Sequence, residues 1–386
     1  MHCTPTEELA CKLVKIPSVT PADLGCQDLL AAPLQACGFK IIKLPCQDVN
    51  NLLALHGEGT PFTLFLGHTD VVPPGERASW RHEPFLGECV EYDGQPVLYG
   101  RGSADMKTGD AAMTMALCDF VTARPDHPGT VGLLITSNEE GDARGGTPYA
   151  LEYLKAQQLI PDYCMIAECS CERVFGDEIK NGRRGDCNAT LVIAGKQGHV
   201  ALPEHCLNAA HEAARFITAM LAHPLDLGDR YFPPSSFQIS NMHCGTGADN
   251  VVPGSCTLRC NFRYNNQQNY ESLQAHTQAV LEAEGIRAEL DWQPEGLPFF
   301  TPEGAFTRAV QHSVAQVLGI TPTFSARGGT SDGRFVAQLG TQVIEFGPVS
   351  STIHQADERV SWEVIEQLKQ IYELSLHRLC ALPPKI

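Results

Sequence analysis

The sequence predicts an α/β protein whose main domain has a mixed sheet covered by helices on both faces, with a ferredoxin-like βαββαβ domain inserted into it. Three observations lead to this prediction. Short apolar runs end at polar residues, helical patterns lie between these runs, and the middle of the chain has a strand and helix order of its own. At 386 residues the chain is too long for one simple core and suits two domains.

Short continuous apolar runs are typical of strands that are buried on both faces of a sheet. In chain order the runs are NLLALHG (51–57), FTLFLGH (62–68), VGLLITSNEE (131–140), YCMIAE (163–168) and TQVIEFG (341–347). Residues 106–121 carry apolar side chains near helical spacing, and residues 361–380 place theirs on one helix face. Strands that alternate with helices indicate a sheet covered on both sides.

The middle of the chain follows the order strand, helix, strand, strand, helix, strand, which is the ferredoxin-like pattern. The predicted elements are residues 189–195, 207–221, 235–245, 255–264, 270–285 and 286–293. We therefore expect an inserted domain at residues 181–295 and a discontinuous main domain at residues 1–180 and 296–386.

Composition excludes several classes of protein. A net charge of -17 argues against nucleic-acid binding and against docking on anionic membranes. No run approaches the roughly 18 apolar residues that span a bilayer, and the N-terminal residues lack the apolar region of a signal peptide. The 16 cysteines are irregularly spaced and contain no CxxC pair, which indicates reduced thiols. We expect a cytoplasmic protein.

Ionisable residues follow the apolar runs at the points where the predicted strands end. His68 and Asp70 follow one run, Glu139 and Glu140 end a second, and Glu168 ends a third. Ligands of open α/β sheets bind outside the carboxyl ends of the strands, so these side chains should converge. Asp70 could accept the second ring N–H of His68, as carboxylates and carbonyls do for metal-bound imidazoles.

Asp105, in a glycine-bounded loop, and His354, after residues 341–347, extend this set. Converging carboxylates repel one another unless cations are present. Nitrogen and oxygen ligands without a thiolate suit zinc, with manganese or cobalt as alternatives. Three carboxylates and one hydroxide would balance two divalent cations. This count leaves Glu139 spare as a candidate general base.

Eight motifs together resemble the M20 family of dinuclear zinc hydrolases: GHTDVVPPG, GRGSADMKTG, TSNEEG, IKNGRRG, KQGHVALP, SSFQISN, GTGADNVVP and GGTSDGRF. The resemblance covers almost the whole chain. It implies hydrolysis of the amide bond of N-succinyl-L,L-diaminopimelate to succinate and L,L-diaminopimelate, in lysine and diaminopimelate biosynthesis. Within the family, the motifs NGRRG, SFQISN and GGTSDGRF are the ones that resemble enzymes with this activity.

The resemblance implies two Zn²⁺ ions per subunit, with Co²⁺ able to replace them. One zinc would be held by His68, Asp105 and Glu168. Asp105 would bridge to a second zinc, which Glu140 and His354 would also hold. The peptide bond that follows Asp105 would be cis.

The resemblance also implies catalytic roles. Asp70 would orient His68, and Glu139 would take a proton from the attacking water and pass it to the leaving amine. His199, in the inserted domain, would stabilise the oxyanion. The inserted domain would act as a lid and pair with its copy in a homodimer, so that His199 would reach the metals of the partner.

The implied substrate is a small anionic N-acyl amino acid, which needs a local cationic pocket in so acidic a protein. Arg183 and Arg184 can form bidentate pairs with carboxylates. The resemblance further implies that Thr330 and Ser331 donate to a carboxylate, and that Asn250 contacts the substrate from the lid.

Other functions stay open at this point. A deacetylase for acetylornithine or a related N-acyl amino acid would need no clamp for an acyl carboxylate. A peptidase would use the same amide chemistry. A non-catalytic metal-binding protein would have closed coordination and no need of Glu139 as a base.

Overall fold

The computed structural model describes residues 3–384, which form two compact units. The described part of unit 1 comprises residues 3–181, 301–325 and 331–384, and unit 2 comprises residues 182–300 and 326–330. Unit 2 thus takes in residues 296–300 and 326–330, which lie outside the range expected for the inserted domain.

Unit 1 is built on an eight-stranded mixed sheet. In spatial order its strands are β1 (Lys40–Lys43), β2 (Asn51–Glu58), β6 (Gly129–Thr136), β3 (Phe62–His68), β7 (Tyr163–Ile166), β18 (Gln342–Glu345), β8 (Glu178–Lys180) and β17 (Thr323–Ser325). Strand β3 runs parallel to both β6 and β7, whereas β2 pairs antiparallel with β6. Every residue of β3 and β6 is buried, which explains their continuous apolar sequences.

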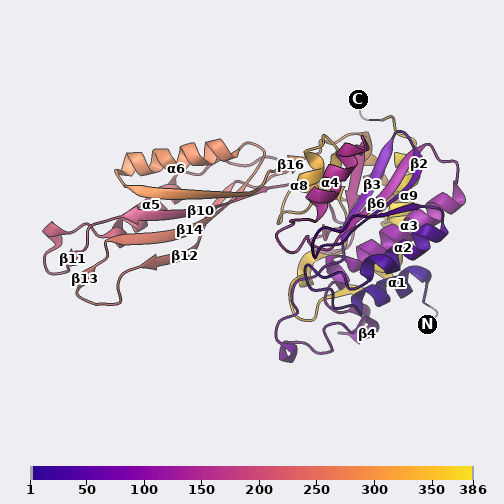
Figure 1. Cartoon of the computed structure of the whole chain (residues 1–386), viewed down its shortest axis with the longest axis horizontal. Coiled ribbons are helices and arrows are strands. Elements are labelled where there is room, and N and C mark those ends of the chain that lie inside the picture. The colour runs from indigo at the N-terminus through magenta and orange to yellow at the C-terminus, as the bar shows by residue number, and fades with distance from the viewer. Residues whose placement is uncertain (1–2, 385–386) are drawn as a thin grey trace. The chain divides into compact units, whose positions relative to one another are not determined.

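Helices cover both faces of this sheet (Figure 1). Helix α3 packs against β3 and β6 and contacts α1, α2 and α9, while α4 packs against β2, β6 and α8. The helices of unit 1 are α1 (Pro5–Val14), α2 (Cys26–Ala36), α3 (Thr108–Ala123), α4 (Thr147–Ala156), α7 (Ala305–Leu318), α8 (Gly333–Ala337) and α9 (Trp362–Leu379). The predicted α/β fold with a mixed sheet is confirmed. Within residues 3–384, no helix is long and apolar enough to cross a membrane.

A small antiparallel sheet in unit 1 is important for the site. It joins β19 (Arg359–Ser361) to β5 (Gln95–Tyr99), which pairs with β4 (Glu88–Tyr92). This sheet brings the segment after His354 beside the segment before Asp105. The contact joins parts of the chain that are about 250 residues apart in sequence.

Unit 2 has the strand and helix order βαββαβ around an antiparallel four-stranded sheet. Its elements are β10 (Gly185–Ala194), α5 (Ala209–Ala222), β12 (Ser236–Cys244), β14 (Ser255–Tyr264), α6 (Tyr270–Glu284) and β15 (Ala288–Gly296), with the short pairs β9 (Gly182–Arg183)–β16 (Phe299–Phe300) and β11 (Gly198–His199)–β13 (Val251–Val252). Strand β10 begins four residues before the predicted position, because its first residues alternate between buried and partly exposed and form no apolar run. The roles of lid and dimerisation domain stay predictions.

Candidate metal centre

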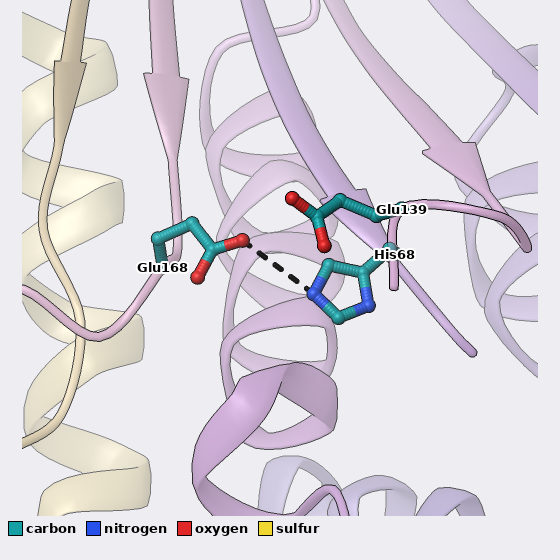
Figure 2. A group of neighbouring side chains, drawn as sticks. All are labelled: His68, Glu139 and Glu168. Carbon is teal, nitrogen blue, oxygen red and sulfur yellow. Dashed lines mark ion pairs between the residues drawn. The ribbon is translucent and has the colours of Figure 1, made fainter. Parts of the chain in front are cut away.

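Three neighbouring parallel strands of unit 1 deliver ionisable side chains to one edge of the sheet. His68 is the last residue of β3, Glu139 follows β6, and Glu168 follows β7 (Figure 2). The Nε2 atom of His68 lies 3.5 Å from a carboxylate oxygen of Glu168. One oxygen or nitrogen atom from each of these three residues lies within 4.8 Å of the other two, and the same holds for His68, Asp105 and Glu140, so more acidic groups surround His68 than one cation needs.

Asp105 lies between two imidazoles. Its Oδ1 is 3.2 Å from Nε2 of His68, and its Oδ2 is 3.4 Å from Nε2 of His354. The same nitrogen of His354 is 2.9 Å from Oε1 of Glu140. The structure therefore gathers one group around His68 and another around His354, with the Asp105 carboxylate common to both. The peptide bond between Asp105 and Met106 is cis, as predicted.

Asp70 is fully buried and makes two kinds of contact. Its backbone carbonyl lies 2.9 Å from Nδ1 of His68, which orients the imidazole. Its carboxylate accepts the backbone N–H groups of Glu139 at 3.1 Å and Glu140 at 3.0 Å. The carboxylate therefore holds the segment that carries both glutamates, and the closest contact with His68 comes from the main chain.

The pKa values in the cluster reflect both burial and charge. Burial raises the pKa of Glu139 well above its usual range and the pKa of Glu168 to about 7, and Asp105 adds to the latter shift. Burial by itself lowers the pKa of His68, but contacts with Asp105 and Glu168 outweigh it and raise this pKa well above its usual value. Contacts with carboxylates, Asp105 first, raise the pKa of His354 to about 10. The carboxylates thus require positive charge beside them, which divalent cations would supply.

The donor set contains nitrogen and oxygen atoms, although a thiol lies nearby. Cys169 follows Glu168 directly, but its Sγ donates to the carbonyl of Ala104 at 3.2 Å. Burial raises the pKa of the Cys169 thiol well above its usual value. A protonated thiol is a poor metal ligand. The residues present therefore fit a metal that accepts imidazole and carboxylate, such as zinc or cobalt.

The two predicted arginines belong to unit 2. Arg183 is buried, and its guanidinium donates to the carbonyl of Arg327 at 3.3 Å, beside the loop that contains Thr330. Arg184 is partly buried, and its Nε has no hydrogen-bond partner among residues 3–384. Burial, and then the neighbouring Arg263, lower the pKa of Arg184. Within unit 2, Arg183 thus lies beside Arg327, and Arg184 lies near Arg263, which brings positive charge together.

His199 and Asn250 also meet within unit 2. His199 pairs with Val251 across β11 and β13, and the carbonyl of Asn250 accepts the N–H of Val200. Both His199 and Asn250 are exposed. Ser331, in unit 1, is fully buried and donates its hydroxyl to Glu345. The structure thus places these residues, and their roles toward a substrate stay predictions.

The sequence analysis did not single out two buried acids beside the cluster. Asp332 follows Ser331, and burial raises the pKa of Asp332 to about 6. Its charge also raises the pKa of Glu139. Glu358 contacts the loop of Asp105. Asp332 stands inside the GGTSDG motif, which was a usable signal, whereas Glu358 is marked only by its position four residues after His354.

Comparisons with known proteins show which family the chain resembles. Residues 64–378 match the model of the peptidase family M20/M25/M40. The chain is 46% identical to succinyl-diaminopimelate desuccinylase of Thiobacillus denitrificans, over 97% of this chain and 94% of the relative. It is 45% identical to the enzyme of that name from Stutzerimonas stutzeri, over 98% of each chain.

Two solved structures share the fold at low sequence identity. The aminopeptidase PepT from Bacillus cereus superposes with a TM-score of 0.78 at 19% identity, over 97% of this chain and 98% of that chain. The YXEP protein of Bacillus subtilis, described as a dinuclear metal binding peptidase from the M20 family, has a TM-score of 0.72 at 17% identity, over 98% of each chain.

Proposed function

The chain belongs to the peptidase family M20/M25/M40, and we propose that it is a metal-dependent amidohydrolase with succinyl-diaminopimelate desuccinylase activity. Water would split N-succinyl-L,L-diaminopimelate into succinate and L,L-diaminopimelate, a step of lysine and diaminopimelate biosynthesis. The observation that carries the proposal is the Asp105 carboxylate, whose two oxygens face His68 and His354.

We propose that His68, Asp105 and Glu168 hold one Zn²⁺, and that Asp105, Glu140 and His354 hold a second. The imidazole and carboxylate donors support this assignment, and the same donors accept Co²⁺. When bound, the ions supply a Lewis acid for the amide carbonyl and lower the pKa of the attacking water.

The other acidic residues would handle protons and orientation. Glu139 would accept a proton from the attacking water and return it to the leaving amine. Its place beside His68 and Glu168 supports this role, and its pKa is raised from the usual range of a carboxyl group, which strengthens it as a base. Asp70 would keep Glu139 in place through the backbone N–H bond. His199 would donate to the oxyanion.

Substrate recognition would depend on unit 2. The substrate has three carboxylates and one ammonium, so a protein with a net charge of -17 needs a cationic pocket to bind it. Arg183 and Arg184 would grip carboxylates, with Asn250 and Thr330 as further donors. Ser331, in unit 1, would donate to the substrate only by giving up its bond to Glu345. The proximity of Arg184 to Arg263 supports this role.

The lid, the homodimer and the cytoplasmic location belong to the same proposal. The inserted domain, expected at residues 181–295, would close over the substrate and pair with its copy in a second chain. The proposed role in amino-acid biosynthesis supports a cytoplasmic location.

The test is a substrate panel on zinc-loaded protein: N-succinyl-L,L-diaminopimelate, N-acetylornithine and dipeptides. We expect turnover of the succinyl substrate to dominate. Arg183→Ala should lower kcat/KM far more for the succinyl substrate than for any residual acetyl turnover, whereas the exposed Arg215→Ala, a control in the same unit, should change neither. Dominant turnover of N-acetylornithine or of dipeptides would refute the proposed substrate.

A further inference from the structure

The buried carboxylate of Glu358 is fully committed to the loop that carries Asp105. Its Oε1 accepts the backbone N–H groups of Ala104 at 2.9 Å and Asp105 at 3.1 Å. Its Oε2 forms an ion pair with Arg101 at 2.6 Å, and both side chains are at most 2% exposed. One carboxylate therefore fixes both the main chain at Asp105 and the start of its loop.

Glu358 also belongs to the loop that presents His354. His354 and Asp357 adopt left-handed backbone conformations, with φ of 59° and 58°, which non-glycine residues rarely keep without support. Asp357 supplies part of that support by accepting hydrogen bonds from the hydroxyls of Tyr92 and Tyr99. Glu358 adds to that support, and its bonds run directly to the loop of Asp105.

We propose that Glu358 is a positioning residue for the metal centre, which sets the distance between the Asp105 carboxylate and the His354 imidazole. The two side chains come from loops about 250 residues apart, and the Glu358 carboxylate links the second loop directly to the backbone N–H group of Asp105 itself. This inference rests on the proposed function, because it assumes that Asp105 and His354 hold a metal. Glu358 itself contacts no reacting atom.

A purely structural role for Glu358 makes a different prediction. Breaking a buried ion pair lowers stability in any part of a protein, because the remaining charge is left without a partner. A structural residue would therefore lower the free energy of unfolding and leave the metal affinity of the folded chain unchanged. A positioning residue lowers the metal affinity of chains that are still folded, since residues behind metal ligands typically contribute 10–100-fold.

The experiment measures Co²⁺ binding to metal-stripped protein by titration calorimetry, with circular dichroism to show that each variant is folded. Glu358→Gln keeps the shape of the side chain but cannot serve all its donors: with the amide oxygen toward Ala104 and Asp105, the NH₂ group faces Arg101 and the ion pair is lost. Arg101→Lys is a milder change, because lysine keeps the positive charge beside Glu358 but holds its carboxylate less firmly than the guanidinium does. The control is Asp162→Asn, which removes a buried carboxylate that accepts the N–H of Phe62 at the opposite end of β3.

We expect Glu358→Gln to weaken Co²⁺ binding by about 10–100-fold. Arg101→Lys should weaken it less, and Asp162→Asn should change it less than twofold. The visible spectrum of Co²⁺ bound to Arg101→Lys should also differ from that of the wild type. Wild-type Co²⁺ affinity and a wild-type Co²⁺ spectrum in the folded variants would overturn this inference and leave the proposed function standing. A wild-type chain that bound no Co²⁺ would overturn the proposed function and this inference with it.

Discussion

The substitution Asp70→Asn tests how the site holds its two adjacent glutamates. The Asp70 carboxylate accepts the N–H groups of Glu139 and Glu140, and an asparagine can accept only one of them. Its NH₂ group would face the other N–H. A hydrogen bond to a charged group contributes about 1.5–3 kcal/mol, and the remaining bond weakens because its acceptor becomes neutral. We expect the free energy of unfolding to fall by about 2–4 kcal/mol.

The functional effect should exceed the effect on stability. Release of the segment displaces the proposed base Glu139, a type of residue that contributes about 10²–10⁴-fold to rate. We therefore expect kcat for amide hydrolysis to fall at least ~100-fold, measured at saturating Zn²⁺ so that lost metal affinity is compensated. Asp177→Asn is the control, because the two oxygens of Asp177 accept the backbone N–H groups of Glu172 and Arg173 outside the metal centre. If Asp70→Asn loses stability as this control does but keeps kcat within about threefold, the reasoning is refuted.

Three further predictions concern the base, the dimer and the acid stability of unit 1. Glu139→Gln should retain both metals by elemental analysis and lose at least ~100-fold in kcat, and loss of one metal would contradict its role as a base. Subunit exchange between inactive Glu139→Gln and His199→Ala dimers should restore roughly one quarter of wild-type activity if His199 acts across the dimer, whereas no recovery after confirmed exchange would exclude this arrangement. Burial, and then the charge of His127, lower the pKa of His56, whose Nδ1 lies 2.9 Å from Nε2 of His127. Below about pH 6.5 the unfolded chain therefore binds more protons than the folded chain, and the free energy of unfolding falls. His56→Gln should therefore lose less unfolding free energy than the wild type between pH 7.5 and 5.5 in urea titrations, and an equal loss would contradict the assignment.

The fold could be predicted where burial leaves a periodic trace in the sequence. Strands β3 and β6 are buried on both faces, so their sequences are continuous apolar runs. Helix α9 carries an apolar face along its whole length and was predicted to within a residue at each end. The start of β10 was missed, because one face of that strand is solvated and its first residues include Asp186 and Asn188. Periodicity cannot separate such a segment from a polar loop.

The candidate site was predictable where parallel strands end side by side. Residues that follow β6, β3 and β7 must meet, since the carboxyl ends of these strands form one edge. The contacts behind the ligands were not predictable in this way. The bonds from Glu358 to the loop of Asp105 join segments that are brought together by pairing of β19 with β5. Nothing in the local sequence of Glu358 encodes that pairing.

The different roles proposed for Glu139 and Glu140 are compatible with the way the chain leaves β6. Adjacent residues of a strand point to opposite faces, so a continued strand could direct only one of these carboxylates into the site. Strand β6 instead ends at Thr136, and the Asp70 carboxylate then binds two consecutive N–H groups and holds the bend. Glu140 reaches His354, while Glu139 lies beside His68 and Glu168. One buried acid from the neighbouring strand end thus allows a proposed ligand and a proposed base to be consecutive residues.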